Sequence, residues 1–310
     1  MRLSLVISTY NEPTALRRCL LGFTVQSRPP DQVIVSDDGS GPATRDVLDA
    51  PAFAGLPLEH VWQEDAGWRK PRAMNLALAH CDGDYVVFCD GDCIPRSDFL
   101  AAHQRHARRR TFLSGSIVDV PPHVHPRLTD EQIVDNSTFA PAVLETLWPQ
   151  MRRQRRRLRP GRWEPLLNLA THRFCTLRGS NFSAWREDLL RVNGCDENFG
   201  YGSEDRELGA RLWNAGVSSR WLKFSLVQLH LGHRRSPDGD RLKRQRRRFR
   251  RLFFTGATRV EPGIDTAVAR GRAAAVPSRH EVISAADQGQ LVVVPFPRAA
   301  SRPHAVHRAA

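Results

Sequence analysis

The first hundred residues alternate between short apolar runs and segments whose apolar residues recur at helical spacing. Strand-like runs cover residues 3–8, 32–36, 58–63 and 84–89, and helical spacing covers residues 14–26 and 71–80. Strands that alternate with helices over short connections indicate a largely parallel sheet covered by helices. The pattern therefore predicts an α/β fold, with a single nucleotide-binding, Rossmann-like domain and a mostly parallel central sheet.

Polar residues follow the first, second and fourth of these strands. Asn11 and Glu12 follow the first strand, residues 37–40 follow the second, and Asp90 and Asp92 end the fourth. The carboxyl ends of parallel strands border the crevice in which open α/β sheets bind their ligands. We therefore expect the ligand site of this chain at that edge of the sheet.

Asp90 and Asp92 are separated by one glycine and follow an uncharged apolar run. Gly91 allows a turn and lets a bulky anion approach the backbone. Two carboxylates are hard oxygen donors that suit Mg²⁺ or Mn²⁺ carrying a diphosphate. An Asp-x-Asp triplet can also be a helix cap or a solvated turn, but its position after a buried strand favours a metal site.

The chain carries a net charge of +13, and nearly all of its cations are arginine. The arginines cluster at residues 108–110, 152–159 and 246–251. Such runs could contact nucleic acid, anionic lipid headgroups or phosphorylated substrates. A solvated basic surface without a partner is the simpler alternative.

The six cysteines show no Cys-x-x-Cys spacing, and several lie inside apolar runs. This usage is typical of reduced, buried thiols in a cytoplasm. No signal peptide is visible, and no run approaches the roughly 18–20 apolar residues that span a bilayer. We expect a cytoplasmic protein, either soluble or peripheral on the inner face of the cell membrane.

Residues 8–12, 35–40 and 90–92 occur in the order and spacing of family-2 glycosyltransferases, which the chain resembles. These are inverting, nucleotide-sugar-dependent enzymes of the GT-A fold. Residues 179–183 through 200–205 resemble the C-terminal catalytic segment of β-1,4-galactosyltransferases and of bacterial polysaccharide-synthesising transferases. The resemblance covers residues 2–235, and four motifs in order make it specific.

The resemblance implies roles on the donor side. It places Thr9, Tyr10 and Glu12 around the nucleoside. Asp38, with Asp37, would accept the imide N–H of uracil through a charge-assisted hydrogen bond. The alternative for these two aspartates is an ordinary turn and helix cap.

Residues 67–75 resemble the family segment in which a basic residue leads a helix beneath the sugar nucleotide. Arg69, Lys70 or Arg72 could hold the diphosphate oxygens, and an arginine could do so bidentately. Asn75 resembles the helix-borne amide of that segment. The alternative is an exposed basic turn.

On the acceptor side, the resemblance assigns Asp205 as the general base and Glu204 to acceptor binding. Tyr201 would offer a flat face to a sugar ring. Ser203 is in the position of a helix N-cap, so the structural alternative is a pair of acids that complement the helix dipole.

Two histidines follow, His230 and His233. The resemblance implies that one of them joins Asp90 and Asp92 as a metal ligand, and both could bind. Imidazole suits Mn²⁺ better than Mg²⁺.

The sequence is thus interpreted as a metal-dependent inverting glycosyltransferase that moves a sugar, expected from a UDP-sugar, to a glycan or lipid-linked acceptor. A nucleotidyltransferase is a rival, but residues 9–13 lack the glycine-rich loop it would need. A non-catalytic, arginine-rich nucleic-acid-binding protein would not need converging acids, so we expect no nucleic acid partner. An anionic membrane surface remains a possible partner of the arginine runs.

We expect four regions. Residues 1–120 form the nucleotide-sugar-binding half, 121–170 a basic insertion or lid, 171–261 the acceptor-binding and catalytic half, and 262–310 a loosely ordered tail rich in Ala, Arg and Pro. An apolar, aromatic patch at residues 139–148 precedes the central arginine run, and it suggests a lid or a surface-docking segment.

Overall fold

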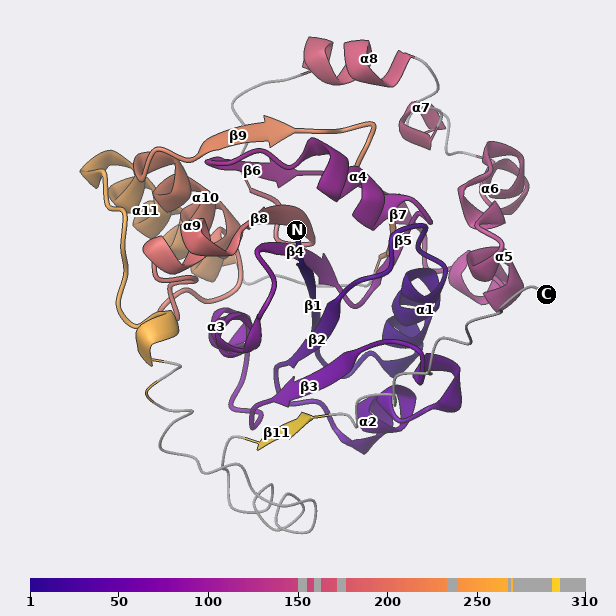
Figure 1. The fold of residues 1–310 in the computed structure, drawn as a ribbon, viewed down its shortest axis with the longest axis horizontal. Helices are drawn as coiled ribbons and strands as arrows, with labels where there is room; N and C mark the ends of the chain where they lie inside the picture. The colour runs from indigo at the N-terminus through magenta and orange to yellow at the C-terminus, as the bar shows by residue number, and fades with distance from the viewer. Residues whose placement is uncertain are drawn as a thin grey trace, which may run out of the picture.

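The structure is a computed structural model that describes residues 1–149, 155–158, 163–171, 177–232, 239–266, 269 and 292–295. Figure 1 shows a central sheet with helices on both of its faces. The described residues form two sheets, and the larger one has the strand order β11-β3-β2-β1-β4-β8-β6-β9. Its strands are β1 (Leu3–Thr9), β2 (Gln32–Asp37), β3 (Leu58–Trp62), β4 (Tyr85–Asp90), β6 (Thr111–Ser114), β8 (Asn181–Trp185), β9 (Ser218–Trp221) and β11 (Val292–Pro295).

The large sheet is mostly parallel, as expected. Strands β3, β2, β1 and β4 run parallel to one another, and so do β6 and β9. Strand β8 is antiparallel to both of its neighbours, and β11 is antiparallel to β3. A smaller sheet has the order β5-β10-β7, made of β5 (Cys93–Pro95), β10 (Val227–Leu231) and β7 (Ser116–Val120).

The register aligns the three strand ends that carry the polar motifs. Thr9 pairs with Asp37, and Ser8 pairs with Asp90 on the other side of β1. The carboxyl ends of β1, β2 and β4 therefore meet at one edge of the sheet, which is where the sequence predicts the ligand site.

Two helices cover opposite faces of this sheet. Helix α1 (Pro13–Thr24) contributes Leu16 and Leu20 to one core cluster, and α3 (Lys70–His80) contributes Leu76 and Ala77 to the other. Side chains of β1 alternate between the two clusters because successive residues of a strand point to opposite faces. Proline at the first turn of each helix fits the start of a helix, where its missing N–H costs nothing.

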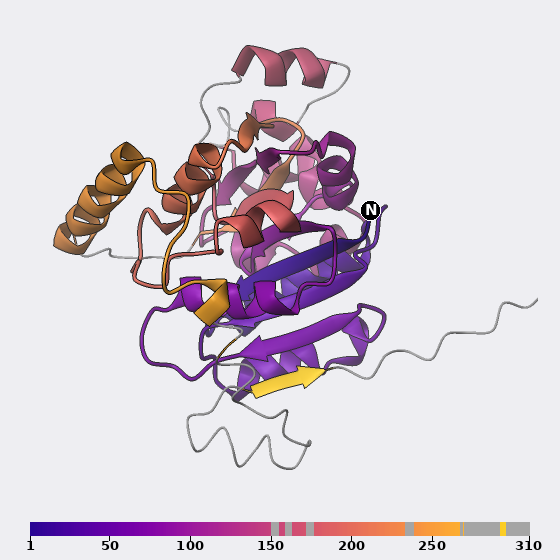
Figure 2. The ribbon, with the colours of Figure 1, turned by 60° about the vertical axis from the view of Figure 1, so that its left-hand side comes forward.

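The other helices surround this centre. They are α2 (Pro42–Leu48), α4 (Phe99–His106), α5 (Asp130–Val134), α6 (Pro141–Leu147), α7 (Arg155–Leu158), α8 (Glu164–Thr171), α9 (Arg186–Arg191), α10 (Glu204–Asn214) and α11 (Gly239–Thr255), with short 3₁₀ turns at Pro51–Phe53, His125–Arg127 and Ser137–Phe139. Helix α11 packs beside α10 at one edge of the molecule, as Figures 1 and 2 show. No helix in the described part of the chain is long and apolar enough to cross a membrane.

The apolar patch at residues 139–148 belongs to the core. Phe139, Leu144 and Leu147 are buried in the same core cluster as α1, and Trp148 packs against it. The expectation of surface docking is therefore wrong for the patch 139–148, because burial makes it part of the core. Whether residues 121–170 act as a lid stays a prediction, as does the division into donor and acceptor halves. Most of the predicted tail lies outside the described residues.

Candidate active site

Asp38 lies where β2 meets the start of α3. Its carboxylate accepts the backbone N–H of Arg69 at 2.7 Å and the side-chain amide of Gln63. Its own N–H donates to the carbonyl of Thr9 at 3.1 Å. Burial raises the pKa of Asp38, and these donors oppose that shift. A carboxylate has further lone pairs beyond two hydrogen bonds, and the residue is 5% exposed. The contact between Asp38 and a nucleobase N–H stays a prediction.

The side chain of Asp37 differs from that of Asp38 in its burial and its partners. Its side chain is fully buried, and it accepts the N–H of Ser40 at 2.8 Å and contacts His60 Nε2 at 3.0 Å. In this conformation a nucleotide cannot reach Asp37. Asp37 therefore stabilises the turn that contains Asp38. This is the ordinary turn that the sequence analysis gave as the alternative to nucleotide binding.

Asn75 is likewise fully buried. Its Oδ1 accepts the N–H of Cys195 at 2.8 Å, and its Nδ2 donates to the Cys195 carbonyl at 2.8 Å and to Glu197 at 3.2 Å. The amide therefore ties α3 to the chain that leads into α10. Instead of facing the predicted nucleotide crevice, it positions the segment that precedes the acceptor motif.

Two other predicted nucleoside contacts lie at the surface near the end of β1. Tyr10 is 48% exposed, and its hydroxyl donates to Asp65 at 2.8 Å. Glu12 occupies the N-cap position of α1 and lines a cavity of ≈ 360 Å³ with Asn11 and Gly232. Both residues are accessible from the edge of the sheet where the motifs meet.

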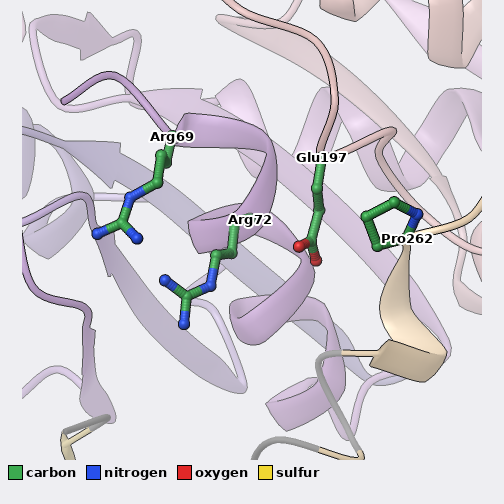
Figure 3. A pocket seen from close by; sticks show the side chains of 4 residues that line it. All are labelled: Arg69, Arg72, Glu197 and Pro262. Atoms are coloured by element: carbon green, nitrogen blue, oxygen red, sulfur yellow. The ribbon is translucent and has the colours of Figure 1, made fainter. Parts of the chain in front are cut away.

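Arg69 and Arg72 line a second cavity, of ≈ 360 Å³, with Glu197 and Pro262. Figure 3 shows both guanidinium groups projecting from the start of α3 on the same side, away from the Glu197 carboxylate. Arg69 also donates to the carbonyl of Glu64. Two guanidinium groups on the same side of α3 form a basic patch that suits phosphate oxygens.

Lys70, between these arginines in the sequence, reaches the acidic motif itself. Its ammonium group contacts the carboxylate of Asp90, and the same oxygen accepts the Ser8 hydroxyl at 2.6 Å. Burial opposes the charge on Lys70, yet the neighbouring charge of Asp90 raises its pKa above the usual range. Of the three cations that the sequence left open, Lys70 is the one beside the paired carboxylates.

Asp92, His230 and Asp119 form a network of three polar side chains. One of its oxygens lies 3.3 Å from His230 Nε2, and His230 Nδ1 lies 2.8 Å from Asp119. Burial would lower the pKa of His230, but both carboxylates outweigh it and raise that pKa to about 10. The hydrogen bond with His230 lowers the pKa of Asp119.

The small sheet brings the three side chains of this network together. Asp92 directly precedes β5, and in β10 His230 pairs with Cys93 of β5 and with Asp119 of β7. The sequence analysis missed Asp119. The available signal was its position as the one carboxylate in the otherwise uncharged strand β7.

The donor atoms of Asp92 and His230 suit a divalent cation such as Mn²⁺. His230 Nδ1 against Asp119 is the outer-sphere arrangement that orients a metal-binding imidazole. Asp90, in contrast, is paired with Lys70. Among the described residues no group of three His, Cys, Asp or Glu side chains is arranged to hold a metal ion. The other predicted ligand, His233, lies outside the described residues.

The two acids of the acceptor motif begin α10. Glu204 accepts the N–H of Gly202 at 2.8 Å, and Asp205 accepts the N–H of Gly179 at 3.2 Å. Burial raises the pKa of Glu204 to about 7, with help from Asp205 and against the opposing charge of Lys70. Ser203 is the N-cap residue by position, but its side chain makes no capping hydrogen bond.

The loop before α10 contacts the segment before α3. Tyr201 and Trp68 pack edge to face, with ring centroids 5.9 Å apart. The sequence analysis did not select Trp68. An aromatic pair of this kind links the donor and acceptor motifs across more than a hundred residues of chain.

A buried ion pair within α10, between Glu207 and Arg211, connects the helix to the chain that precedes it. Arg211 is 1% exposed, and it binds the Glu207 carboxylate and the carbonyls of Val192 and Gly194, at 2.6 and 2.7 Å. The next residue, Cys195, is the one that Asn75 holds from α3. A continuous set of hydrogen bonds therefore runs from α10 to α3.

The sequence matches two models of known protein families. Residues 4–183, more than half of the chain, match the family model for glycosyl transferase family 2. The chain belongs to glycosyl transferase family 2. Residues 170–234 match a second model, the N-terminal domain of galactosyltransferase. Both resemblances predicted from the sequence are confirmed.

Validoxylamine A glucosyltransferase of Streptomyces hygroscopicus subsp. limoneus is similar to this family-2 chain, with 32% identity over 233 residues. The match covers 69% of the chain and 48% of that protein. The glycosyltransferase YfnE of Bacillus subtilis, whose activity is uncharacterised, is 25% identical over 275 residues, covering 75% of the chain and 65% of that protein. The chain thus spans about half the length of the validoxylamine A glucosyltransferase it matches.

Solved structures share the fold. S. aureus TarS 1–349 in complex with UDP superimposes with a TM-score of 0.56 at 15% identity, covering 86% of this chain and 68% of that one. The mannosyltransferase PcManGT of Pyrobaculum calidifontis, in complex with GDP-Man and Mn²⁺, gives a TM-score of 0.50 at 19% identity, covering 93% and 79%. The predicted GT-A fold is confirmed.

Proposed function

We propose that this family-2 chain is a metal-dependent, inverting glycosyltransferase that moves a sugar from a UDP-sugar to a hydroxyl of a glycan or glycolipid. The observation that carries the proposal is the meeting of two acidic motifs around one cation. Lys70 contacts Asp90 at the end of β4 and lies near Glu204 at the start of α10. The names of similar proteins support it, since they include a glucosyltransferase and structures with UDP, UDP-GlcNAc or GDP-Man.

In the proposed reaction, Asp205 accepts the proton of the acceptor hydroxyl while the hydroxyl oxygen attacks the anomeric carbon. The bond from that carbon to the diphosphate oxygen breaks, and the sugar inverts its configuration. Lys70, Arg69 and Arg72 offset the charge that develops on the departing diphosphate. Glu204 binds the acceptor, with Tyr201 beside it.

Glu204 is a second candidate for the base. Its pKa of about 7 lies close to a neutral operating pH, which is the optimum for general base catalysis. Asp205→Asn and Glu204→Gln distinguish the two, because loss of the base lowers kcat far more than KM for the acceptor.

We propose that Mn²⁺ or Mg²⁺ binds at Asp92 and His230, with Asp90 or His233 as further ligands. A bound ion would neutralise charge on the diphosphate of the leaving group. Asp119 would keep the His230 ring oriented. Asp38, with Thr9, Tyr10 and Glu12 near the end of β1, would surround the nucleoside.

We also propose a cytoplasmic protein that acts at the inner face of the cell membrane on a lipid-linked acceptor. The net charge of +13 supports this, because anionic leaflets attract arginine-rich surfaces.

Calorimetric titration with UDP, first with Mn²⁺ and then with EDTA, tests the proposed function. We expect binding that depends on the metal and is lost in Asp92→Ala. Asp82→Ala is the matched control, because Asp82 is half-exposed, is paired with Arg2, and precedes β4, whereas Asp90 and Asp92 lie at the other end of that strand. Preference for GDP or dTDP would change the donor class, and failure to bind any nucleoside diphosphate would refute the proposal.

A further inference from the structure

Helix α8 is attached to the body of the protein by its polar side. Asn168 is buried, donates to the Ser225 hydroxyl at 2.7 Å and accepts the N–H of Phe224 at 3.0 Å. Glu164, one turn earlier, accepts the hydroxyl of the same serine. These contacts fix which side of α8 faces the protein.

The opposite side of α8 is apolar and exposed to solvent. Leu166 and Leu169 are 57% and 74% exposed, and Trp163 and Leu167 beside them are also exposed. Figures 1 and 2 both show α8 at the periphery, set apart from the sheet. A single exposed leucine is ordinary, but four large apolar side chains within seven residues form a patch of the kind that marks an interaction site.

The chain next to this patch is strongly cationic. Residues 152–162 contain seven arginines and no acidic residue. Lys223, in the turn that anchors α8, lies 5.4 Å from the ring of Trp221 and 5.5 Å from that of Phe224. A partner for this region has to match an apolar surface and dense positive charge together.

We propose that α8 docks on an anionic lipid bilayer, with Leu166 and Leu169 in the boundary between headgroups and acyl chains. The net charge of +13 attracts the protein to such a surface. At eight residues, or about 12 Å, the helix is too short to span a bilayer and lies in its plane. Nucleic acid would satisfy the arginines but would leave the leucines in water. A lipid surface satisfies both groups.

Helix α11 provides an internal comparison. It is also rich in arginine, and Phe254 at its end is 82% exposed. However, Arg248 binds Asp196 at 2.9 Å and lies 5.0 Å from the ring of Phe199, so one side of α11 is held against the protein. Among the side chains of α11 that the structure describes, Phe254 is the only large hydrophobic one that is exposed, whereas α8 and the residue before it present four.

The test is cosedimentation of the full chain with vesicles of phosphatidylcholine alone or mixed with phosphatidylglycerol. The double variant Leu166→Ser, Leu169→Ser is compared with Phe254→Ser. We expect binding to the anionic vesicles, a partition coefficient at least roughly tenfold lower in the double variant, and a change under twofold in Phe254→Ser. Unchanged circular dichroism and UDP affinity would show that the double variant is folded.

Three results would overturn the proposal. The first is that the protein does not bind anionic vesicles at about 0.15 M salt. The second is that the wild type and the double variant have the same partition coefficient. The third is that Phe254→Ser lowers the partition coefficient as much as the double variant does. Vesicle partition requires neither sugar donor nor turnover. Its failure is therefore distinguishable from failure of the proposed transferase activity.

Discussion

Lys70 lies between the two acidic motifs of the candidate site, residues 90–92 and residues 204–205. It contacts Asp90 on one side, and its charge lowers the pKa of Glu204 on the other. A buried ammonium group between carboxylates balances their charge while no diphosphate is bound. The same group would meet the diphosphate when the donor enters.

Replacing this cation tests its part in donor binding. We expect Lys70→Met to weaken UDP binding roughly tenfold, because a hydrogen bond to a charged group contributes about 1.5 kcal/mol or more. The measurement is calorimetric titration at fixed Mn²⁺. Lys243→Met is the matched control, since Lys243 is exposed on α11. UDP affinity within twofold of wild type would assign the diphosphate to Arg69 and Arg72 instead.

Glu204 makes stability depend on pH. Its pKa is raised to about 7 from an ordinary 4.5, so between these values the folded protein binds more protons than the unfolded chain. Stability from this group is therefore full below pH 4.5, falls as pH rises towards 7 and is constant above, with a total change of at most about 3 kcal/mol. Urea unfolding across pH 5–8 should show this slope, and Glu204→Gln should remove it. An identical slope in both proteins would contradict the assignment.

At the scale of elements, helices α3 and α10 are joined through the turn that precedes the acceptor loop. Arg211 holds the carbonyls of Val192 and Gly194, and Asn75 holds Cys195. Because α3 begins with Lys70 and α10 begins with Glu204 and Asp205, this link sets the distance between the two ends of the candidate site.

Breaking the buried ion pair between Arg211 and Glu207 within α10 should destabilise the protein. Arg211→Met leaves Glu207 buried and unpaired, with an expected loss of about 3–5 kcal/mol in the free energy of unfolding. The double variant Arg211→Met, Glu207→Leu should recover part of that loss, because no unpaired charge remains. Urea denaturation of the three proteins measures both effects. A double variant as unstable as the single one would mean that the carbonyl contacts dominate.

At the scale of the whole molecule, the ligand site is assembled from segments far apart in the chain. Ser8, Lys70, Asp92, Asp119, Glu204 and His230 come from both sheets and both halves of the sequence. A ligand that contacts all of these segments binds only the folded state and therefore stabilises the entire domain.

Thermal unfolding with ligands tests this assembly. Mn²⁺ with UDP at about 100 times its Kd should raise the free energy of unfolding by about 2.7 kcal/mol. EDTA or His230→Ala should remove the part that depends on the metal. An equal stabilisation by UDP in EDTA would show that the nucleotide binds without a cation.

Local patterns in the sequence were enough to place the strands β1 to β4, the helices α1 and α3, and the motif at residues 90–92. Apolar runs, helical spacing and turn residues act over a few neighbours, so they can be interpreted without knowing the rest of the fold. The same local reasoning failed for the patch 139–148, because an apolar run does not reveal what it packs against. It also kept Asp37 and Asn75 among the nucleotide contacts, although burial directs both to backbone groups.

The sequence by itself determined that this chain is an α/β protein of glycosyl transferase family 2, with acids at the ends of particular strands. Tertiary structure decided which cation contacts Asp90, that Asp119 joins His230 across 111 positions, and that α8 turns its leucines outward. The physical reason is how far apart along the chain the interacting residues are. Secondary structure and turn chemistry depend on neighbouring residues, whereas pairing of charges and exposure of a helix face depend on strand register and packing between distant segments.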